Sequence, residues 1–216
     1  METVKIIETE DRNRKLHPNG TYDDCREFIE PYYLEKLNNK ELTEIQDYIS
    51  KLSDSDYNFN ESTEFSHYDG YDDIHYDKYR SCKIHYPKKD SILPRVGKSY
   101  FYSLNNQFWN YDLEDCFEFQ LIKYDIGGNY NWHCDYGIAE RPGVIRKLSM
   151  SIQLTSPEEY HGGELSVVNY GNRTINIPTD LGRVIVFDSK LPHKVWPVVW
   201  GQRLSLVGWA NGPRFR

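Results

Sequence analysis

The second half of the chain consists of short apolar runs that turn residues separate. These runs predict β-strands at Phe117–Tyr124, Lys147–Leu154, Glu164–Asn169, Arg183–Phe187, Lys194–Val199 and Arg203–Trp209. Turn residues stand at Gly127-Gly128, Gly162-Gly163, Gly171-Asn172, Leu181-Gly182 and Gly201. No helical pattern alternates with the strands, as a parallel sheet would require. The pattern therefore predicts an antiparallel jelly roll or closed barrel.

The first half of the chain has a different pattern. Apolar residues recur at steps of three and four along Glu41–Leu52, which predicts an amphipathic helix. A second helix is predicted around Asp24–Leu37, with Pro31 near its start or dividing it in two. Residues 53–90 are dense in Asp, Ser, Asn and Tyr, so mostly loop is expected there, with short strands around Tyr79–His85. Helical support is thus expected to precede a mainly β core.

Aromatic residues gather in two places whose roles the pattern leaves open. Those of Tyr100–Tyr111 can cover the sheet or line a substrate groove, and core packing is the favoured interpretation. The acidic, tyrosine-rich stretch Tyr57–Tyr79 can form a lid over a substrate, but a solvated loop is favoured.

Composition narrows the class of protein. The 216 residues, 38% of them hydrophobic and 15% aromatic, fit one globular domain, in which residues 1–115 support a core at 116–212. A net charge of -7 gives no broad attraction to nucleic acids or anionic membranes. With no signal-like or membrane-spanning run and four dispersed cysteines, a soluble cytoplasmic protein with reduced thiols is expected.

A candidate metal site begins in the segment Asn131–Gly137. On an extended segment His133 and Asp135 project to the same face, whereas Cys134 points away and is interpreted as a packing residue. His193, downstream after a predicted strand, supplies a second histidine. Two histidines and one carboxylate form a facial triad, which leaves about three of six octahedral positions open, as non-haem Fe(II) oxygenases require.

Arg203 lies ten positions after His193 and opens the sequence Arg203-Leu204-Ser205. If the two predicted strands form a hairpin with the odd-length loop Trp200-Gly201-Gln202, His193 and Arg203 share one face. Arg203 and Ser205 can then bind a carboxylate, because a guanidinium offers two parallel hydrogen bonds. A surface ion pair is the alternative role for Arg203.

Residues 117–216 resemble the prolyl 4-hydroxylase-like branch of the Fe(II)/2-oxoglutarate dioxygenases, including its arginine-bearing bacterial and phage hydroxylases. The segments that carry the resemblance are YDIGGNYNWHCD, RKLSMSIQL, YHGGEL and LPHKVWPVVWGQRLSLVGW. The resemblance implies a double-stranded β-helix of the jelly-roll or cupin-like type. It also implies that His133, Asp135 and His193 bind iron and that Arg203 binds the distal carboxylate of 2-oxoglutarate.

The resemblance further implies that Tyr124 lies beside 2-oxoglutarate and that Gln153 contacts it. Collagen-type prolyl hydroxylases usually have lysine where this chain has Arg203, and animal oxygen-sensing relatives commonly have an aromatic residue at the Gln153 position. Asp135 is present, whereas related halogenases have a small residue there. Hydroxylation is therefore favoured over halogenation.

The activity that the resemblance implies is hydroxylation of an unactivated C–H bond with O2 and 2-oxoglutarate, giving succinate and CO2, with ascorbate as a candidate reductant. A prolyl residue in a peptide or protein is the favoured substrate, and a lysyl residue or small molecule is the alternative. Two other classes stay open. A cupin-like barrel can bind a metal or ligand without catalysis, and a zinc hydrolase would need a general base, for which Glu164 is the only candidate.

Overall fold

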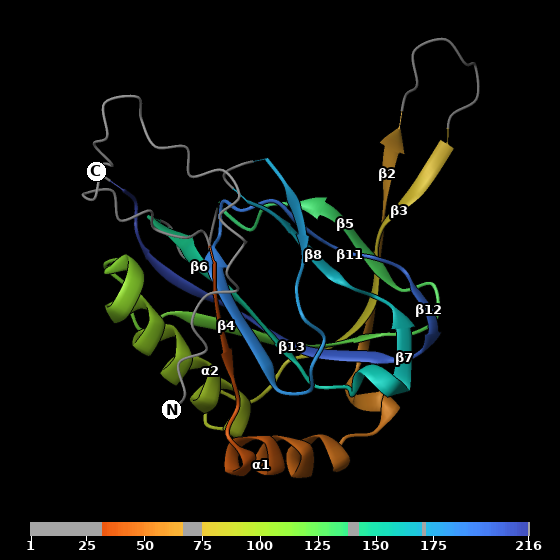
Figure 1. The fold of residues 1–216 in the computed structure, drawn as a ribbon, viewed down its shortest axis with the longest axis horizontal. Coiled ribbons are helices and arrows are strands. Elements are labelled where there is room, and N and C mark those ends of the chain that lie inside the picture. The colour runs from red at the N-terminus through yellow and green to blue at the C-terminus, as the bar shows by residue number, and fades with distance from the viewer. Residues whose placement is uncertain (1–31, 67–74, 138–142, 170–171, 216) are drawn as a thin grey trace, which may run out of the picture.

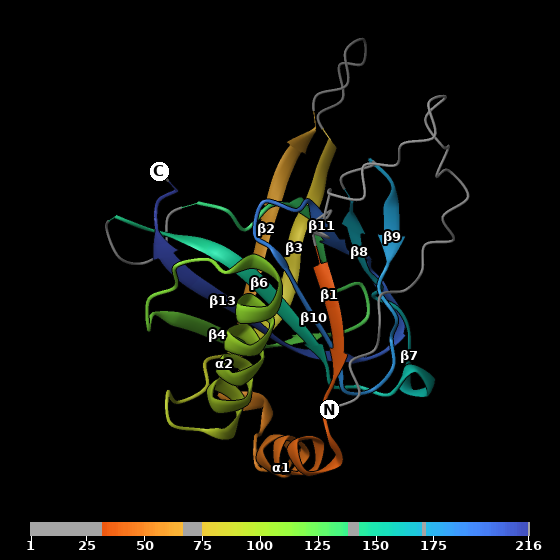
Figure 2. The ribbon, with the colours of Figure 1, turned by 60° about the vertical axis from the view of Figure 1, so that its left-hand side comes forward.

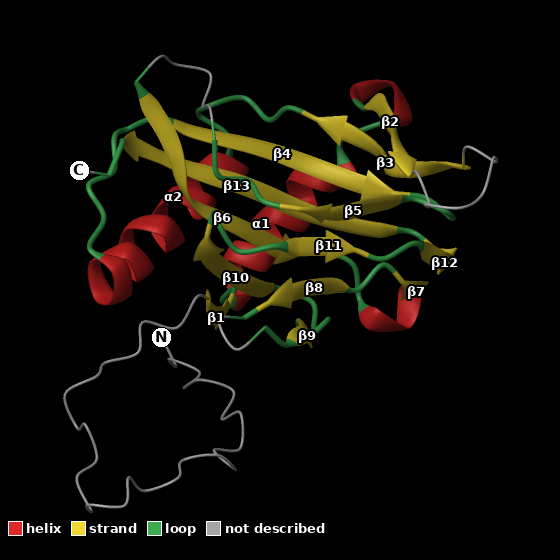
Figure 3. Ribbon diagram, turned by 90° about the horizontal axis from the view of Figure 1, so that it is seen from above, coloured by secondary structure: helices red, strands yellow, loops and turns green. Residues whose placement is uncertain are grey.

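The computed structural model describes residues 32–66, 75–137, 143–169 and 172–215. Its main feature is a curled antiparallel sheet of eleven strands, in the order β1-β10-β6-β13-β4-β3-β5-β11-β8-β9 with β2 paired to β3 (Figures 1 and 3). The strands are β1 (Tyr32–Lys36), β2 (Asn58–Ser66), β3 (His75–His85), β4 (Phe117–Tyr124), β5 (Asn129–His133), β6 (Val144–Gln153), β8 (Leu165–Val168), β9 (Thr174–Asn176), β10 (Arg183–Asp188), β11 (His193–Val195) and β13 (Arg203–Pro213). Strands β7 (Tyr160–Gly162) and β12 (Val198–Gly201) pair separately. The predicted mainly β, antiparallel jelly-roll fold is confirmed.

Two helices cover one face of the sheet, as Figure 2 shows for α2 against β4, β6 and β13. They are α1 (Asn39–Ser50) and α2 (Ile92–Leu104), and a π-helical turn, η2 (Asn105–Trp109), continues α2. Short 3-10 turns are η1 (Asp54–Asp56) and η3 (Pro157–Glu159). Asn38 and Glu41 form a capping box at the start of α1, because each side chain accepts the other's backbone N–H. The predicted helix over Glu41–Leu52 is confirmed.

Strand β4 shows how the apolar pattern builds two cores. Phe119 and Leu121 face α2 and join the cluster between helices and sheet, whereas Ile122 and Tyr124 face the interior of the curled sheet. Alternate side chains of a strand project to opposite faces, so both faces of this sheet are buried. The interior cluster surrounds the pocket described below.

Three expectations for the first half need correction. The part of the predicted helix Asp24–Leu37 that the structure describes is strand β1, which pairs with β10. Residues 58–66 and 75–85 form a long hairpin that projects from the body (Figure 1), where mostly loop was expected, although the short strands predicted around Tyr79–His85 do lie within β3. Helix α2 was not predicted at all. Part of the predicted helix and the tip of the Tyr57–Tyr79 stretch lie outside the described residues.

The aromatic residues of Tyr100–Tyr111 pack mainly as core, as favoured. Phe101 and Trp109 are buried, and the ring of Phe108 stacks on Tyr33 with centroids 3.4 Å apart. No helix in the described ranges is long and apolar enough to cross a membrane.

Candidate metal centre

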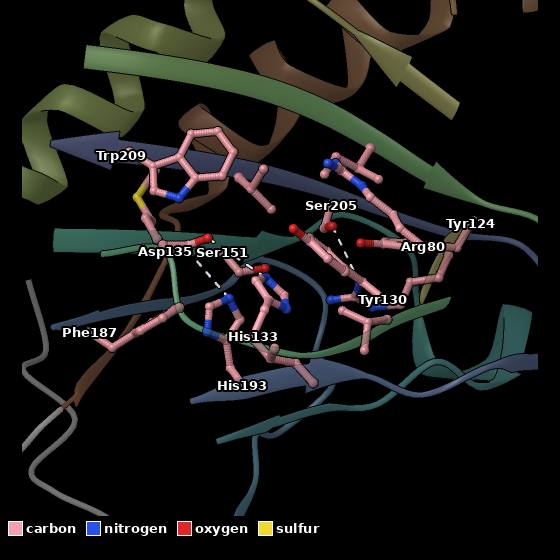
Figure 4. Close-up of a pocket in the computed structure, with 16 residues that line it drawn as sticks. Arg80, Tyr124, Tyr130, His133, Asp135, Ser151, Phe187, His193, Ser205 and Trp209 are labelled. Atoms are coloured by element: carbon pink, nitrogen blue, oxygen red, sulfur yellow. Dashed lines mark hydrogen bonds and ion pairs between the residues drawn. The ribbon is translucent and has the colours of Figure 1, made fainter. Parts of the chain in front are cut away.

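His133, Asp135 and His193 come together inside the curled sheet (Figure 4). His133 ends β5 and pairs directly across the ladder with His193, which begins β11. Nε2 of His133 lies 3.7 Å from Oδ1 of Asp135, and Nε2 of His193 lies 3.4 Å from Oδ2. The donor atoms all lie within 4.8 Å of one another, so one metal ion can contact all three residues.

Both histidines are held in the tautomer that a metal requires. Nδ1 of His133 is 2.7 Å from the carbonyl oxygen of Asn131, and Nδ1 of His193 is 2.9 Å from that of Leu191. A carbonyl only accepts, so each Nδ1 must donate, and each Nε2 keeps its lone pair for a metal. Burial, with the neighbouring His193, lowers the pKa of His133 to about 4, so this ring is neutral at neutral pH.

Asp135 is held as a carboxylate. Burial by itself would raise its pKa, but His193, His133 and a hydrogen bond from the indole N–H of Trp209 hold the pKa well below the usual range. The hydroxyl of Ser149 also donates to Oδ2, at 2.8 Å. The side chain is only 7% exposed, so little water competes for these contacts.

The donor set suits Fe(II). It offers imidazole nitrogens and one carboxylate on a single face, which leaves open positions for other ligands. Cys134, the residue between two of the ligands, is exposed, and its thiol donates to the carbonyl of Lys190. Cys134 therefore contributes no thiolate to the cluster, and its expected exclusion agrees with its position.

The triad lines a pocket that Arg203, Ser205 and Tyr124 also line. Arg203 is buried, and its guanidinium contacts neutral groups: the hydroxyl of Ser205 at 3.4 Å, the phenol of Tyr160 and the ring of Tyr124. Among the described residues, no carboxylate lies within 4.0 Å of it. A surface ion pair is excluded by this burial, and the guanidinium can receive a carboxylate from a ligand.

Of the two supporting residues that the resemblance implied, Tyr124 lines the pocket and Gln153 does not. Tyr124 is fully buried and lines the pocket. Gln153 does not line it; its amide donates to the phenol of Tyr160 and to the carbonyl of Thr155, and it borders a second, smaller pocket. Glu164, the candidate general base of a zinc hydrolase, lines neither of these two pockets.

The predicted hairpin between His193 and Arg203 is wrong. Strand β11 ends at Val195, Pro197 offers no N–H to a ladder, and the chain continues into β12, which pairs with β7. Arg203 instead begins β13, which pairs with β4 and β6. Both residues nevertheless line the same pocket, because the curled sheet brings β11 and β13 to face each other.

Several pocket residues were missed. The ring of Tyr130 stacks on His133, with ring centroids 3.5 Å apart. The guanidinium of Arg80 lies over the same Tyr130 ring, 4.6 Å from its centroid. Trp209 shares the inward face of β13 with Arg203 and Ser205, so period-two alternation could have identified it. Arg80 lies in the short strands predicted around Tyr79–His85, but no motif there marked it as a residue of the site.

Comparison with known proteins agrees with this geometry. Residues 119–211 match the family described as the 2OG-Fe(II) oxygenase superfamily. A PKHD-type hydroxylase of Janthinobacterium sp. (strain Marseille) is 36% identical over 94 residues, covering 41% of this chain and 41% of the relative. A PKHD-type hydroxylase of Gloeothece citriformis is 36% identical over 89 residues, covering 41% and 40%. The chain thus matches about two fifths of the length of these curated relatives.

Solved structures share the fold over most of the chain. A Pseudomonas putida prolyl-4-hydroxylase superposes with a TM-score of 0.64 at 18% identity, covering 86% of this chain and 94% of that one. A Trichoplax adhaerens prolyl hydroxylase, in complex with a hypoxia inducible factor peptide fragment, gives 0.58 at 19% identity and covers 83% of each chain. The predicted resemblance to prolyl 4-hydroxylase-like 2-oxoglutarate oxygenases is confirmed as a resemblance: residues 119–211 match the 2OG-Fe(II) oxygenase superfamily, and the solved structures share the fold.

Proposed function

We propose that this chain is an Fe(II)- and 2-oxoglutarate-dependent dioxygenase that hydroxylates a prolyl residue in a peptide or protein. The observation that carries the proposal is the buried Arg203, which has no carboxylate neighbour among the described residues and faces the same pocket as the metal-binding triad. A cupin-like barrel that only binds metal has no need of such a cation. The pocket therefore supports a ligand that joins a metal-binding end to a distal carboxylate, as 2-oxoglutarate does.

Each residue of the site has a role in this proposal. His133, Asp135 and His193 hold the iron, and Arg203 with Ser205 holds the distal carboxylate beside Tyr124. When bound, Fe(II) with 2-oxoglutarate and O2 supplies the oxidising chemistry, in which 2-oxoglutarate becomes succinate and CO2 and one oxygen atom enters a substrate C–H bond. The chain itself positions the reactants and excludes water.

Apolar side chains provide that exclusion of water. The pocket walls include Ile122, Leu165, Phe187, Val195 and Val207, which come from strands around the curled sheet. A dry wall also strengthens the interaction between Arg203 and a carboxylate, because charges interact more strongly where water is excluded. The peptide substrate is favoured by the prolyl hydroxylase fold, one example of which was solved with a peptide fragment.

The test is succinate formation after the protein is supplied with Fe(II), 2-oxoglutarate, ascorbate and O2. We expect the native chain to form succinate and His133→Ala to lose this activity, because one of three metal ligands is removed. Cys134→Ala is the matched control, because this exposed neighbour points away from the metal donors. Equal succinate from the native chain and His133→Ala would contradict the site.

Mass spectrometry of peptides then tests the substrate. We expect proline-containing peptides to gain one oxygen atom. Oxygen added to lysine-containing peptides or to small molecules instead would overturn the prolyl assignment while leaving the reaction class intact.

A further inference from the structure

We propose that Ser149 and Ser189 form a relay of two hydroxyl groups that positions the carboxylate of Asp135 for metal binding. Ser189 would then tune metal affinity although it touches none of the metal donor atoms. The inference rests on the proposed metal site and concerns how the chain keeps one ligand in place. We call this pair the serine relay.

The direction of the hydrogen bonds in the relay is fixed by chemistry. Ser149 Oγ lies 2.8 Å from Oδ2 of Asp135 and 2.9 Å from Oγ of Ser189. An ionised carboxylate only accepts hydrogen bonds, so the single proton of Ser149 must point to Asp135. The proton between the two hydroxyls therefore comes from Ser189. A donated bond polarises Ser149 and strengthens its own bond to the carboxylate.

Both hydroxyl groups of the serine relay are buried away from solvent. Ser149 is 1% exposed and Ser189 is 0% exposed, so a bulk water molecule cannot take over either hydroxyl. The backbone of Ser189 is also tied on both sides. Its N–H donates to the carbonyl of Lys147 on β6, at 3.0 Å, and its carbonyl accepts the N–H of Tyr136, at 2.8 Å, in the loop that carries Asp135.

Trp209 completes the support from the neighbouring strand. It is the direct cross-strand partner of Ser149 in the β13–β6 ladder, and its indole N–H also donates to Asp135. Figure 4 shows Trp209 and His193 on either side of the Asp135 carboxylate. Asp135 lies in a loop rather than a strand, so these donors from β6 and β13 hold it in the orientation that faces the histidines.

The test measures Mn(II) affinity of the full chain by electron paramagnetic resonance of the free ion, which requires no turnover. Partners of metal ligands typically change metal affinity by about 10- to 100-fold, so we expect Ser149→Ala to weaken Mn(II) binding about tenfold. Ser189→Ala should weaken it by a smaller factor. The double variant should bind no more weakly than Ser149→Ala, because removal of Ser149 already cuts the path from Ser189 to Asp135.

Control variants separate the relay from ordinary packing. Ser166→Ala removes another fully buried, hydrogen-bonded serine, which contacts Asn176 and Trp196 rather than the triad, and it should keep native affinity. Ser149→Thr retains a hydroxyl and should restore most of the affinity that Ser149→Ala loses. Independent, multiplying effects of the two alanine substitutions would overturn the relay.

The outcomes also distinguish the relay from the metal site itself. If His133→Ala binds Mn(II) as tightly as the native chain, the metal site fails and the proposed function fails with it. If His133→Ala loses binding but both serine variants bind like the native chain, the relay alone is wrong.

Discussion

Arg203 is a cation that the fold buries among neutral groups. Taking a charge out of water is unfavourable unless an opposite charge or good hydrogen bonds offset it. Here the offset comes from the hydroxyls of Ser205 and Tyr160, which leave the charge itself uncompensated. Arg203 can therefore bind an anionic ligand, and burial of its uncompensated charge lowers the stability of the fold when that ligand is absent.

Substitution of Arg203 should act on the 2-oxoglutarate end of the pocket. Hydrogen bonds to charged groups contribute about 1.5–3 kcal/mol, so Arg203→Gln should weaken 2-oxoglutarate binding to the Mn(II)-loaded protein by about 10- to 100-fold. Arg203→Lys should lose less, because the charge remains although the forked geometry is lost. Calorimetric titration measures both.

The control for this comparison is Arg183→Gln, because Arg183 already pairs with Asp180 and borders only the second cavity. It should leave the affinity for 2-oxoglutarate near the native value. Unchanged affinity in Arg203→Gln would remove Arg203 from the ligand-binding role.

Single residues of the candidate site could be predicted from the sequence where they lie close together along the chain. His133 and Asp135 are two residues apart, and alternation on an extended segment places both on one face. The hydrogen bonds that hold Asp135 come from Ser149 and Trp209 on other strands, and no local pattern relates those positions to Asp135. They become visible only when strand register is known.

Among the elements, α2 packs against the sheet through a glycine, Gly97. A Cβ added to Gly97 would lie 2.2 Å from Cε1 of Phe119 and 2.9 Å from Cε of Met150. Glycine at this position lets the helix approach β4 and β6 closely, even though glycine is a poor helix former. The face of β4 opposite to this contact carries Ile122 and Tyr124, which line the pocket.

Gly97→Ala should destabilise the fold despite the better helix propensity of alanine. Overpacking of a core costs about 1–3 kcal/mol, against a gain of up to about 1 kcal/mol in helix propensity. Chemical denaturation should therefore show a lower free energy of unfolding. Ser103→Ala, at an exposed position of the same helix, is the control and should be neutral or stabilising. If Gly97→Ala were also stabilising, the side chains of Phe119 and Met150 would have to move aside at little cost, which would contradict this prediction.

Elements were predictable where apolar residues had a clear period. Strand β4 has the predicted bounds, and α1 lies within two residues of the predicted start and end. The stretch Tyr32–Lys36 gave no clear period, and its pairing with β10 is a tertiary contact that its own residues do not encode. Residues 58–62 of β2 are all exposed, so no buried face marked this strand and it resembled a loop.

The candidate site is built from residues of several strands that lie far apart in the sequence. The proposed metal ligands come from β5, its following loop and β11, and the proposed carboxylate-binding residues come from β13. A ligand that binds only the folded state stabilises it, by about 2.7 kcal/mol when present at 100 times its dissociation constant. Metal and 2-oxoglutarate should therefore stabilise the same cooperative unit.

Thermal unfolding tests this linkage. Mn(II) alone should raise the unfolding temperature of the native chain, and 2-oxoglutarate added with Mn(II) should raise it further. A chelator should reverse both increments. In Arg203→Gln, the rise in unfolding temperature caused by Mn(II) should remain, and the further rise caused by 2-oxoglutarate should shrink. An equal further rise in the native chain and in Arg203→Gln would contradict the assigned binding mode.

The pairing of β1 with β10 has a consequence for the order in which the chain is made. A ribosome synthesises Tyr32–Lys36 long before Arg183–Asp188, so the first strand of the described sheet emerges well before β10, the strand with which it pairs there. Until β10 arrives, the backbone of β1 lacks the strand with which it pairs in the described sheet, and an unpaired strand edge can bond with a wrong one. Completion of the sheet is therefore a late event in biogenesis, and a chain released before residue 183 would lack both the strand that accepts β1 and the second histidine of the site.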